Sequence, residues 1–224
     1  LKLCRYTGQK KAEDCVEAAV RAYQEIIQKS EELGIAWIQF DEPALVQDMS
    51  GEEIAFFHKI YDAVLPCAKQ SKILLQTYFG DVRDIYRDII QMPFAGIGLD
   101  FVEGKETRCL IKEYGFPKDK LLFAGLVNGK NIWRNPYEKT LKTVRKLKEQ
   151  GIQTVLSTSC SLLHVPYTVK HEEKLSGEYL AYFAFAEEKL QELQELSVLA
   201  DDENYLSHPA YCKNKELFAG DRDC

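Results

Sequence analysis

The sequence predicts an α/β fold with a parallel sheet, of the (β/α)8 TIM-barrel type but incomplete, with about strands four to eight. Three observations predict this fold. Five short apolar stretches alternate along the 224 residues with stretches of helical period. The apolar stretches are nearly continuous, which is typical of strands that helices cover on both faces. Polar residues follow each stretch, and no glycine-rich phosphate fingerprint does.

The position of these polar residues favours a barrel over a doubly wound sheet. In a barrel, the carboxyl ends of all the strands converge on one mouth. A doubly wound sheet instead gathers its ligands at one switch point. Because polar residues follow all five apolar stretches here, we expect a barrel mouth. The strands start about 23 to 38 residues apart, which is the length of a βα repeat.

The first half of the chain begins with a helix. Apolar residues spaced three and four apart predict this helix over residues 12–33, and Gly34 ends it. Residues 35–40 are predicted to form a strand. A serine with a glutamate three residues later predicts a capping box for the helix over residues 50–67. The strand over residues 72–79 follows.

The second half continues the alternation. Glycines end two of its helices, and a proline begins one, where the missing N–H would be unpaired in any case. The predicted strands are residues 96–102, 121–126 and 153–158, and the predicted helices are residues 82–90, 105–114, 137–150 and 171–199. Residues 200–224 are polar and contain Pro and Gly, so we expect a tail or the start of an interdomain linker.

The number of strands is too small for a closed barrel. Such a barrel needs eight strands and about 250 residues, and only residues 1–4 remain for one more strand. We therefore expect residues 1–199 to be the C-terminal part of a barrel whose first three strands precede Leu1. The start at a leucine rather than a methionine fits this expectation.

Composition excludes several classes of protein. A hydrophobic content of 46% with a net charge of −6 is that of a globular protein rather than a disordered one. The acidic balance argues against non-specific binding of nucleic acid. No apolar run reaches the roughly 20 residues of a membrane span, and we find no secretory signal. Seven cysteines without close pairs predict free thiols in a reducing compartment, the cytoplasm.

The candidate site is the mouth where the strands end. We expect this pocket to be lined by side chains at the strand ends or just beyond them. They are Asp41, Glu42, Thr77, Tyr78, Asp100, Asn128, Cys160 and His164.

Three of these residues carry carboxylates that permit a structural or a functional interpretation. Asp41 and Glu42 are adjacent, and Pro43 favours an extended backbone before it, so we expect only one of the two to face the mouth. A solvated loop is the alternative. Asp100 ends an apolar strand, where a carboxylate needs a hydrogen bond or a cation. The alternative is a purely structural partner on a neighbouring strand.

Later loops carry further candidates. Cys160 and His164 lie four residues apart, which suggests nucleophile or metal chemistry, but the chain offers too few further ligands for a complete metal site. Cys160 is then a small residue in a crowded mouth. Lys130 can meet an anion or be merely solvated. Trp133 and Arg134 can stack or bind a carboxylate, or they can pack at the entry to a helix.

Four motifs, in order, carry a resemblance to a known family. They are WIQFDEPAL at residues 37–45, TYFG at 77–80, LFAGLVNGKNIWR at 122–134 and STSCSLLH at 157–164. Together they resemble the N-terminal domain of cobalamin-independent methionine synthase, over nearly the whole chain. The resemblance implies a protein of two (β/α)8 barrels. The C-terminal barrel would bind zinc and homocysteine, whose thiolate takes the methyl group of 5-methyltetrahydrofolate polyglutamate.

The resemblance also implies what this barrel lacks. The zinc ligands of the other barrel correspond to Tyr78, Gly80, Asp100 and Cys160 here, and only the cysteine is kept. We therefore expect no metal and no catalytic residue in this chain. The N-terminal barrel would help to hold the folate and would brace the catalytic barrel, its missing partner.

Two other functions stay open. One is a stand-alone barrel paralogue that has no catalytic barrel and acts as a binding or scaffold module. The other is a related barrel methyltransferase with its own site, built from Asp41, Asp100 and Cys160.

Overall fold

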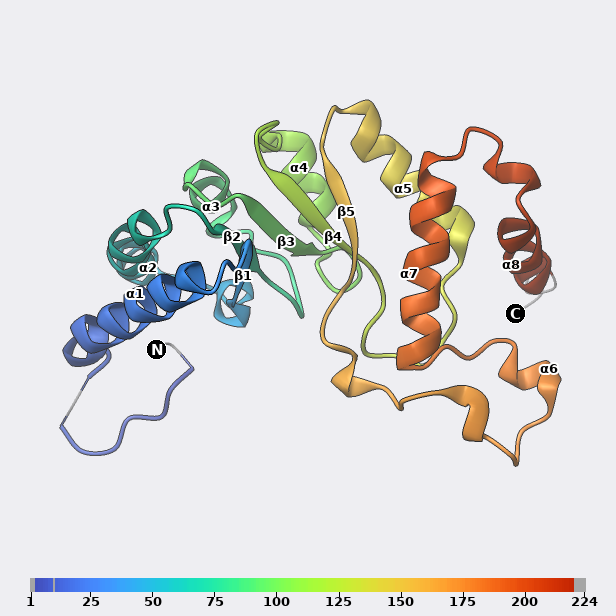
Figure 1. Ribbon diagram of the computed structural model, residues 1–224, viewed down its shortest axis with the longest axis horizontal. Coiled ribbons are helices and arrows are strands. Elements are labelled where there is room, and N and C mark those ends of the chain that lie inside the picture. Colours follow the sequence, from blue (N-terminus) through green and yellow to red (C-terminus); the bar gives the residue numbers. More distant parts are fainter. Residues whose placement is uncertain (1–2, 10, 220–224) are drawn as a thin grey trace.

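A computed structural model describes residues 3–9 and 11–219 of the chain. Its five strands form one parallel sheet, with helices around the outside (Figure 1). The strands are β1 (Trp37–Asp41), β2 (Lys72–Gln76), β3 (Gly96–Asp100), β4 (Leu121–Val127) and β5 (Thr154–Thr158). The helices are α1 (Val16–Glu32), α2 (Gly51–Val64), α3 (Tyr86–Gln91), α4 (Thr107–Tyr114), α5 (Tyr137–Glu149), α6 (Gly177–Leu180), α7 (Ala186–Asp201) and α8 (Pro209–Ala219).

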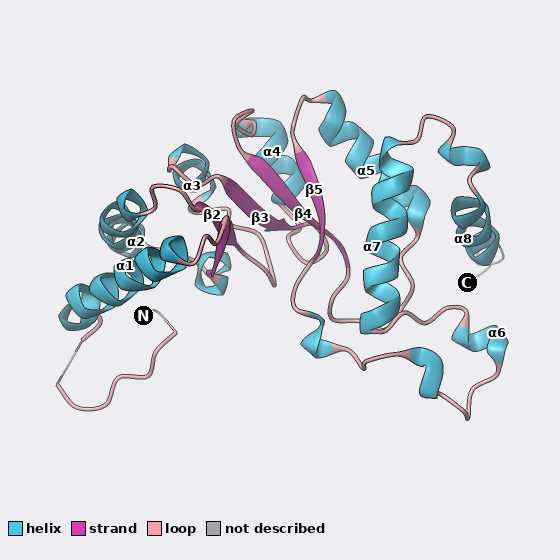
Figure 2. Ribbon diagram, in the orientation of Figure 1, coloured by secondary structure: helices cyan, strands magenta, loops and turns pink. Residues whose placement is uncertain are grey.

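The order of the strands in the sheet identifies the fold class. They lie in the order β1-β2-β3-β4-β5, so each strand pairs in parallel with the next one along the chain. A doubly wound sheet reverses its strand order at a switch point, and this sheet has no reversal. The α/β class and the incomplete barrel are therefore confirmed. Figure 2 shows the alternation of strands and helices.

Burial along the sheet shows that its two edges are open. Every residue of β3 is buried, whereas β1 and β5, which each have one neighbour, are partly exposed. The core lies between the sheet and its helices. On β3, Ile97 and Leu99 are almost completely buried, as are Leu122 and Ala124 on β4. These alternate residues belong to one apolar cluster together with Ile89 of α3.

Several helix boundaries are formed as the sequence predicts. At the start of α2, the Glu53 N–H donates to Ser50 Oγ at 3.3 Å, and the Ser50 N–H donates to Glu53 Oε2 at 2.8 Å. The predicted capping box is therefore confirmed. The glycines after three helices, Gly34, Gly115 and Gly151, all have positive φ angles of 72° to 76°, which favour glycine at a helix end.

The single helix predicted over residues 171–199 is wrong in its first half. The helix α7 begins only at Ala186. The preceding segment instead pairs with the loop after β4, where the Ala184 N–H donates to the Ile132 carbonyl at 2.8 Å and Phe183 forms a β-bridge with Trp133. Helical periodicity is a local signal in the sequence, so it cannot predict a tertiary pairing of this kind.

The segment after residue 199 also contains a helix that the sequence did not predict. In α8, Tyr211 is buried in a second apolar cluster together with Tyr137 and Leu141 of α5. Asn214 fixes the start of α5, because its Oδ1 accepts the Tyr137 N–H and its Nδ2 donates to the Asn135 carbonyl, both at 2.9 Å. The domain division after residue 199 stays a prediction.

A few expectations fall on residues that the structure does not describe. Residues 1–2, part of the possible extra strand, lie outside the described residues, as do residues 220–224 of the predicted tail with the seventh cysteine. The six described cysteines are all free thiols. Of the helices that the described residues form, none is both long and apolar enough to span a membrane.

Candidate functional site

The carboxyl ends of the five strands meet at one edge of the sheet, and the loops beyond them form the mouth. Asp100, at the end of β3, organises two of these loops. Its side chain is 1% exposed. Oδ1 accepts the N–H groups of Val102 and Glu103, at 2.7 and 2.9 Å, and Oδ2 accepts the Phe79 N–H at 3.0 Å. Burial raises the pKa of Asp100, and these three hydrogen bonds partly oppose the rise.

Phe79, in the loop after β2, has a conformation that is unusual for its residue type. Its φ angle is +72°, in the left-handed region that L residues rarely adopt. The Asp100 hydrogen bond holds this backbone in place. The Lys130 ammonium lies 5.0 Å from the centre of the Phe79 ring and 2.8 Å from Glu103 Oε1. His164, which is exposed, packs edge-on against the same ring at 5.4 Å.

The mouth therefore joins the loops after β2, β3, β4 and β5. The sequence placed Tyr78, Asp100, Asn128 and His164 in this region but missed Phe79 and Glu103. Lys130 was left open between an anion and solvent, and its partner is a carboxylate of this chain. The opposite charges of Glu103, after β3, and Lys130, after β4, are a signal in the sequence that could have indicated Glu103.

A second part of the site is a cavity of about 620 Å³ beside the end of β1. Both Asp41 and Glu42 line it, as does Tyr78. Both residues adjoin this cavity, and which of the two carboxylates faces the mouth stays a prediction. Glu42 has a ψ angle of 66° rather than the extended backbone expected before Pro43, so the alternation of a strand does not continue through it.

The environments of these two carboxylates differ. Asp41 is exposed, and its Oδ1 accepts from Gln39 Nε2 at 2.7 Å. Glu42 is half-buried, and its Oε1 accepts the Tyr61 hydroxyl at 2.5 Å. Burial raises the pKa of Glu42, and the hydrogen bond from Tyr61 opposes the rise. Burial, together with the negative charges of Asp41 and Glu42, raises the pKa of Tyr78.

The remaining predicted residues have mainly structural contacts. Thr77 is buried, and its Oγ1 donates to the Gly98 carbonyl at 2.8 Å. Asn128 Oδ1 accepts the N–H groups of Lys130 and Asn131, at 2.8 and 3.0 Å, and so fixes the turn after β4.

Cys160 is packed closely at the mouth. It is 5% exposed, and a Cβ added to Gly129 would lie 2.4 Å from the Cys160 carbonyl oxygen. Burial raises the pKa of its thiol, so the reactive thiolate is disfavoured. This environment is the opposite of the one that activates a cysteine nucleophile.

The positions that correspond to zinc ligands do not fit a zinc ion. Gly80 has no side chain to act as a ligand, and both carboxylate oxygens of Asp100 accept backbone N–H groups. A thiol with a raised pKa at Cys160 disfavours the thiolate that zinc requires. Across the described ranges, 3–9 and 11–219, no three His, Cys, Asp or Glu side chains are arranged to hold a metal.

Buried charges on α7 form a network that the sequence did not reveal. Lys189 and Glu192 are both completely buried. Lys189 Nζ donates to the Trp133 carbonyl at 3.1 Å, and Glu192 Oε1 accepts the Asn135 N–H at 2.9 Å. Arg134 lies 3.8 Å from Glu192 and donates to the Ala181 and Phe183 carbonyls. Arg134 therefore binds a carboxylate, and this carboxylate is structural.

Comparisons with known proteins identify the family. The sequence profile described as "Cobalamin-independent synthase, N-terminal domain" matches residues 1–152. A 5-methyltetrahydropteroyltriglutamate–homocysteine methyltransferase of Campylobacter jejuni is 48% identical over 217 residues, which make up 97% of this chain and 28% of the relative. The Streptococcus thermophilus protein of the same name is 49% identical over 222 residues, which make up 99% of this chain and 29% of the relative.

A solved structure supports the fold alone. A Listeria monocytogenes protein described as a vitamin-B12 independent methionine synthase matches with a TM-score of 0.60 and 19% sequence identity. The match covers 86% of this chain and 56% of that one. The chain spans less than a third of the length of the two methyltransferases. From the profile match and the identity along nearly its whole length, the chain belongs to the cobalamin-independent methionine synthase family, where it corresponds to the N-terminal domain.

Proposed function

We propose that this chain is part of the N-terminal barrel of a zinc-dependent, cobalamin-independent methionine synthase. The reaction is methyl transfer from 5-methyltetrahydrofolate polyglutamate to homocysteine, which forms methionine. The observation that carries this proposal is the identity of 48–49% with methyltransferases of that name over 97–99% of the chain. Within it, residues 1–199 form the barrel segment, and residues 200–224 begin the connection to the second barrel.

The role of this barrel is to support the folate and to brace the catalytic barrel. The mouth suits such a role because its loops are fixed to one another. Asp100 joins the loops after β2 and β3, and the Lys130–Glu103 pair joins those after β3 and β4. The cavity beside Glu42 and Tyr78 offers carboxylate and phenol groups to a ligand at the same edge. A preorganised surface of this kind binds with a smaller ordering cost.

The chain itself carries out no chemistry in this proposal. Zinc belongs to the second barrel, where it would supply a deprotonated, nucleophilic homocysteine sulfur. The strand ends of this barrel instead hold a fixed Asp100 and a Cys160 whose thiol has a raised pKa. The cytoplasm is the compartment we propose, since the six described cysteines are free thiols.

A chimera tests the proposal. The 217 matched residues of the Campylobacter jejuni enzyme would be replaced by those of this chain, and methyl transfer to homocysteine would be measured with the triglutamate substrate. We expect the chimera to transfer the methyl group. A chimera that unfolds cooperatively and holds its zinc, yet transfers no methyl group, would contradict the proposal.

Variants of the same chimera test the mouth. Tyr78→Ala and Glu42→Gln remove groups that line the cavity. We expect them to raise KM for the folate substrate more than they lower kcat, because these groups bind and do not react. The matched control is Tyr114→Ala on α4, an exposed tyrosine outside the cavity. Equal KM values for all three variants would refute a folate role of the mouth.

A further inference from the structure

A groove between α4 and α5 is lined by charged side chains of one sign, all of them cationic. Its volume is about 760 Å³. The apolar side chains of Phe101, Leu126 and Leu147 form part of its lining. Five cationic residues also line it: Arg108 and Lys112 on α4, and Lys139, Lys142 and Lys146 on α5. No Asp or Glu stands among the described residues that line it.

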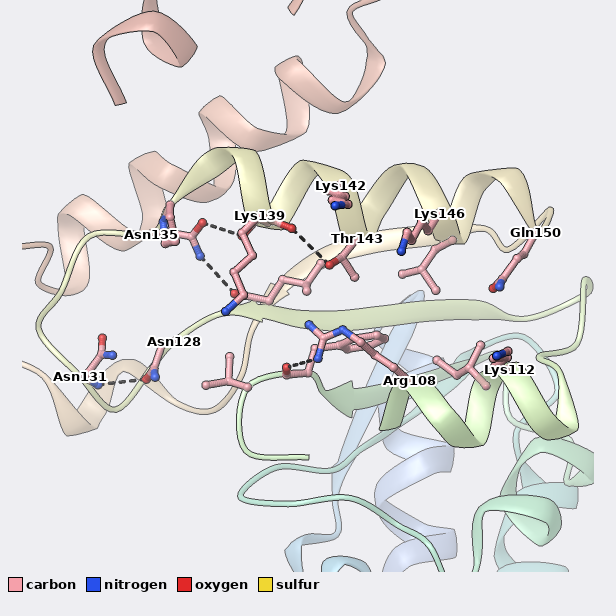
Figure 3. A pocket seen from close by; sticks show the side chains of 17 residues that line it. Arg108, Lys112, Asn128, Asn131, Asn135, Lys139, Lys142, Thr143, Lys146 and Gln150 are labelled. Atoms are coloured by element: carbon pink, nitrogen blue, oxygen red, sulfur yellow. Dashed lines mark hydrogen bonds between the residues drawn. The ribbon is translucent and has the colours of Figure 1, made fainter. Parts of the chain in front are cut away.

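The cations form two facing rows. Lys139, Lys142 and Lys146 are three and four residues apart, so they share one side of α5 and span about 10 Å along it. Arg108 and Lys112 are four residues apart on α4. Figure 3 shows the lysines along α5 above β4, with Arg108 and Lys112 on the opposite side of the strand.

The two other cations of α5, and a lysine of the mouth, have partners within the chain. On the other side of α5, Lys148 pairs with Asp201 at 2.5 Å, and in the mouth Lys130 pairs with Glu103 at 2.8 Å. Arg145 of α5 donates to the Asp202 carbonyl at 3.1 Å. The cations of the groove are therefore distinct from the other cations of this helix.

Among the described residues, the groove cation Arg108 has contacts with uncharged groups. Arg108 Nη1 donates to the Phe101 carbonyl at 3.0 Å, and its guanidinium lies 5.4 Å from the centre of the Phe101 ring. Lys112, Lys139, Lys142 and Lys146 form no ion pair within the described part of the chain. Like charges four residues apart destabilise a helix, and both rows contain such a pair. An anion between the rows would relieve this repulsion.

One end of the groove adds uncharged donors. Asn128 and Asn131 line it there. Their Oδ1 atoms accept backbone N–H groups, Asn128 from Lys130 and Asn131 from Trp133. The amide NH2 groups therefore remain to donate to an oxygen of a ligand. Amide donors at one end and ammonium groups along both walls suit a ligand with oxygen acceptors along its length.

We propose that the groove between α4 and α5 binds a linear polyanion with three or more negative charges, carried by phosphate or carboxylate groups. Concave surfaces of one charge concentrate the field of that charge. A chain of anionic groups meets both rows at once, whereas a single small anion meets one or two cations. A surface with scattered lysines also attracts polyanions, so the groove is distinguished by the loss of this binding when its own cations are removed.

Calorimetric titration of the 224-residue chain tests the proposal. The probes are inorganic tripolyphosphate, a tetraglutamate peptide and orthophosphate, each at about 0.15 M salt, where exposed charges are already screened. We expect tripolyphosphate, the tetraglutamate peptide or both to bind saturably, at least about tenfold more tightly than orthophosphate. Binding of the first alone assigns a phosphate ligand, and binding of the second alone assigns a carboxylate ligand.

Paired variants locate the binding. The double variant Lys142→Gln, Lys146→Gln removes two cations of the groove, and we expect it to lose at least about tenfold in affinity. The control double variant Lys59→Gln, Lys105→Gln removes two exposed lysines outside the groove, with the same change in net charge. We expect its affinity to stay within about twofold of the original.

Three results would overturn the proposal. They are the absence of saturable binding by either polyanion, equal affinity for orthophosphate, and equal loss of affinity in the two double variants. Far-UV circular dichroism and a cooperative melt show whether each variant is folded. If the double variant of the groove does not fold, Lys139→Gln with Lys112→Gln replaces it, and the same expectations hold.

Discussion

The backbone N–H of Phe79 donates a 3.0 Å hydrogen bond to Oδ2 of the buried Asp100. This bond joins the loop after β2 to the end of β3, and it holds Phe79 at a φ angle of +72°. Backbone in this region costs free energy and persists only where the surroundings determine it. Asp100 therefore helps to fix the arrangement of the mouth.

Replacing Asp100 by asparagine tests this dependence. The amide NH2 takes the place of one carboxylate oxygen and meets a backbone N–H, so at least one buried donor loses its acceptor. We expect Asp100→Asn to lower the free energy of unfolding by about 1–3 kcal/mol, measured by urea denaturation at pH 7. The exposed Asp119→Asn should change it by less than about 0.5 kcal/mol. Equal effects would show that Asp100 does not hold the loops.

The hydrogen bond between Tyr61 and Glu42 gives a second prediction. Tyr61→Phe leaves the half-buried Glu42 carboxylate without this donor, so we expect a loss of about 1.5–3 kcal/mol at pH 7 and a smaller loss near pH 4. Tyr86→Phe is the matched control, because the Tyr86 hydroxyl donates to the neutral Gly115 carbonyl at 2.6 Å. Its loss should not change with pH. Parallel pH profiles of the two variants would refute the charged role of Glu42.

The pKa of the buried Glu192 predicts how stability depends on pH. Burial raises this pKa from 4.5 to about 7, although Lys189 and Arg134 oppose the rise. The folded state thus holds the proton more tightly than the unfolded state. The protonated Glu192 side chain therefore contributes its full stabilisation of the folded state below about pH 4.5. This contribution is lost as the pH rises to about 7, which lowers the free energy of unfolding by about 3 kcal/mol.

The variant Glu192→Gln isolates this contribution. Glutamine keeps the acceptor for the Asn135 N–H and puts an amide NH2 where Oε2 of Glu192 has no hydrogen-bond partner. We expect the variant to gain stability relative to the original chain as the pH rises from 5 to 8. The exposed Glu149→Gln is the control. A stability difference that stays constant over this range would contradict the raised pKa.

The contact between Gly129 and Cys160 predicts a steric effect. A Cβ on residue 129 would lie 2.4 Å from the Cys160 carbonyl oxygen, a backbone atom that cannot move away cheaply. We expect Gly129→Ala to lower the melting temperature, with a loss of about 1–3 kcal/mol. Gly51→Ala at the start of α2 meets no atom within 4 Å and should be neutral or stabilising. Similar melting temperatures for both variants would refute close packing at the mouth.

Much of the fold could be predicted from the sequence, because the strands are apolar runs and the helices have their own start and stop residues. The Ser50–Glu53 capping box and the turn at Gly34 follow from local chemistry, and both are present. The start of α7 did not follow, since the pairing of Phe183 with Trp133 across the β4–α5 loop is tertiary. For the same reason the polar sequence did not predict α8, because its contact with α5 through Asn214 is also tertiary.

The sequence suggests where a candidate site lies, at the strand ends, but it does not reveal the contacts there. The strand ends pointed to Asp100 and Glu42 as candidate mouth residues, because parallel strands end at one edge. The partners Tyr61 and Phe79 come from other elements of the chain, and no spacing in the sequence connects them. The basic stripe of α5 is visible in the sequence, but the facing row on α4 is not.

We propose that this chain is part of a methionine synthase yet supplies no catalytic centre of its own. The most direct test is methyl transfer from 5-methyltetrahydropteroyltriglutamate to homocysteine by the purified 224-residue chain with added zinc, once a cooperative melt has shown that it is folded. We predict no methionine above the blank without protein. Methionine formed at a rate proportional to the concentration of this chain would contradict the claim.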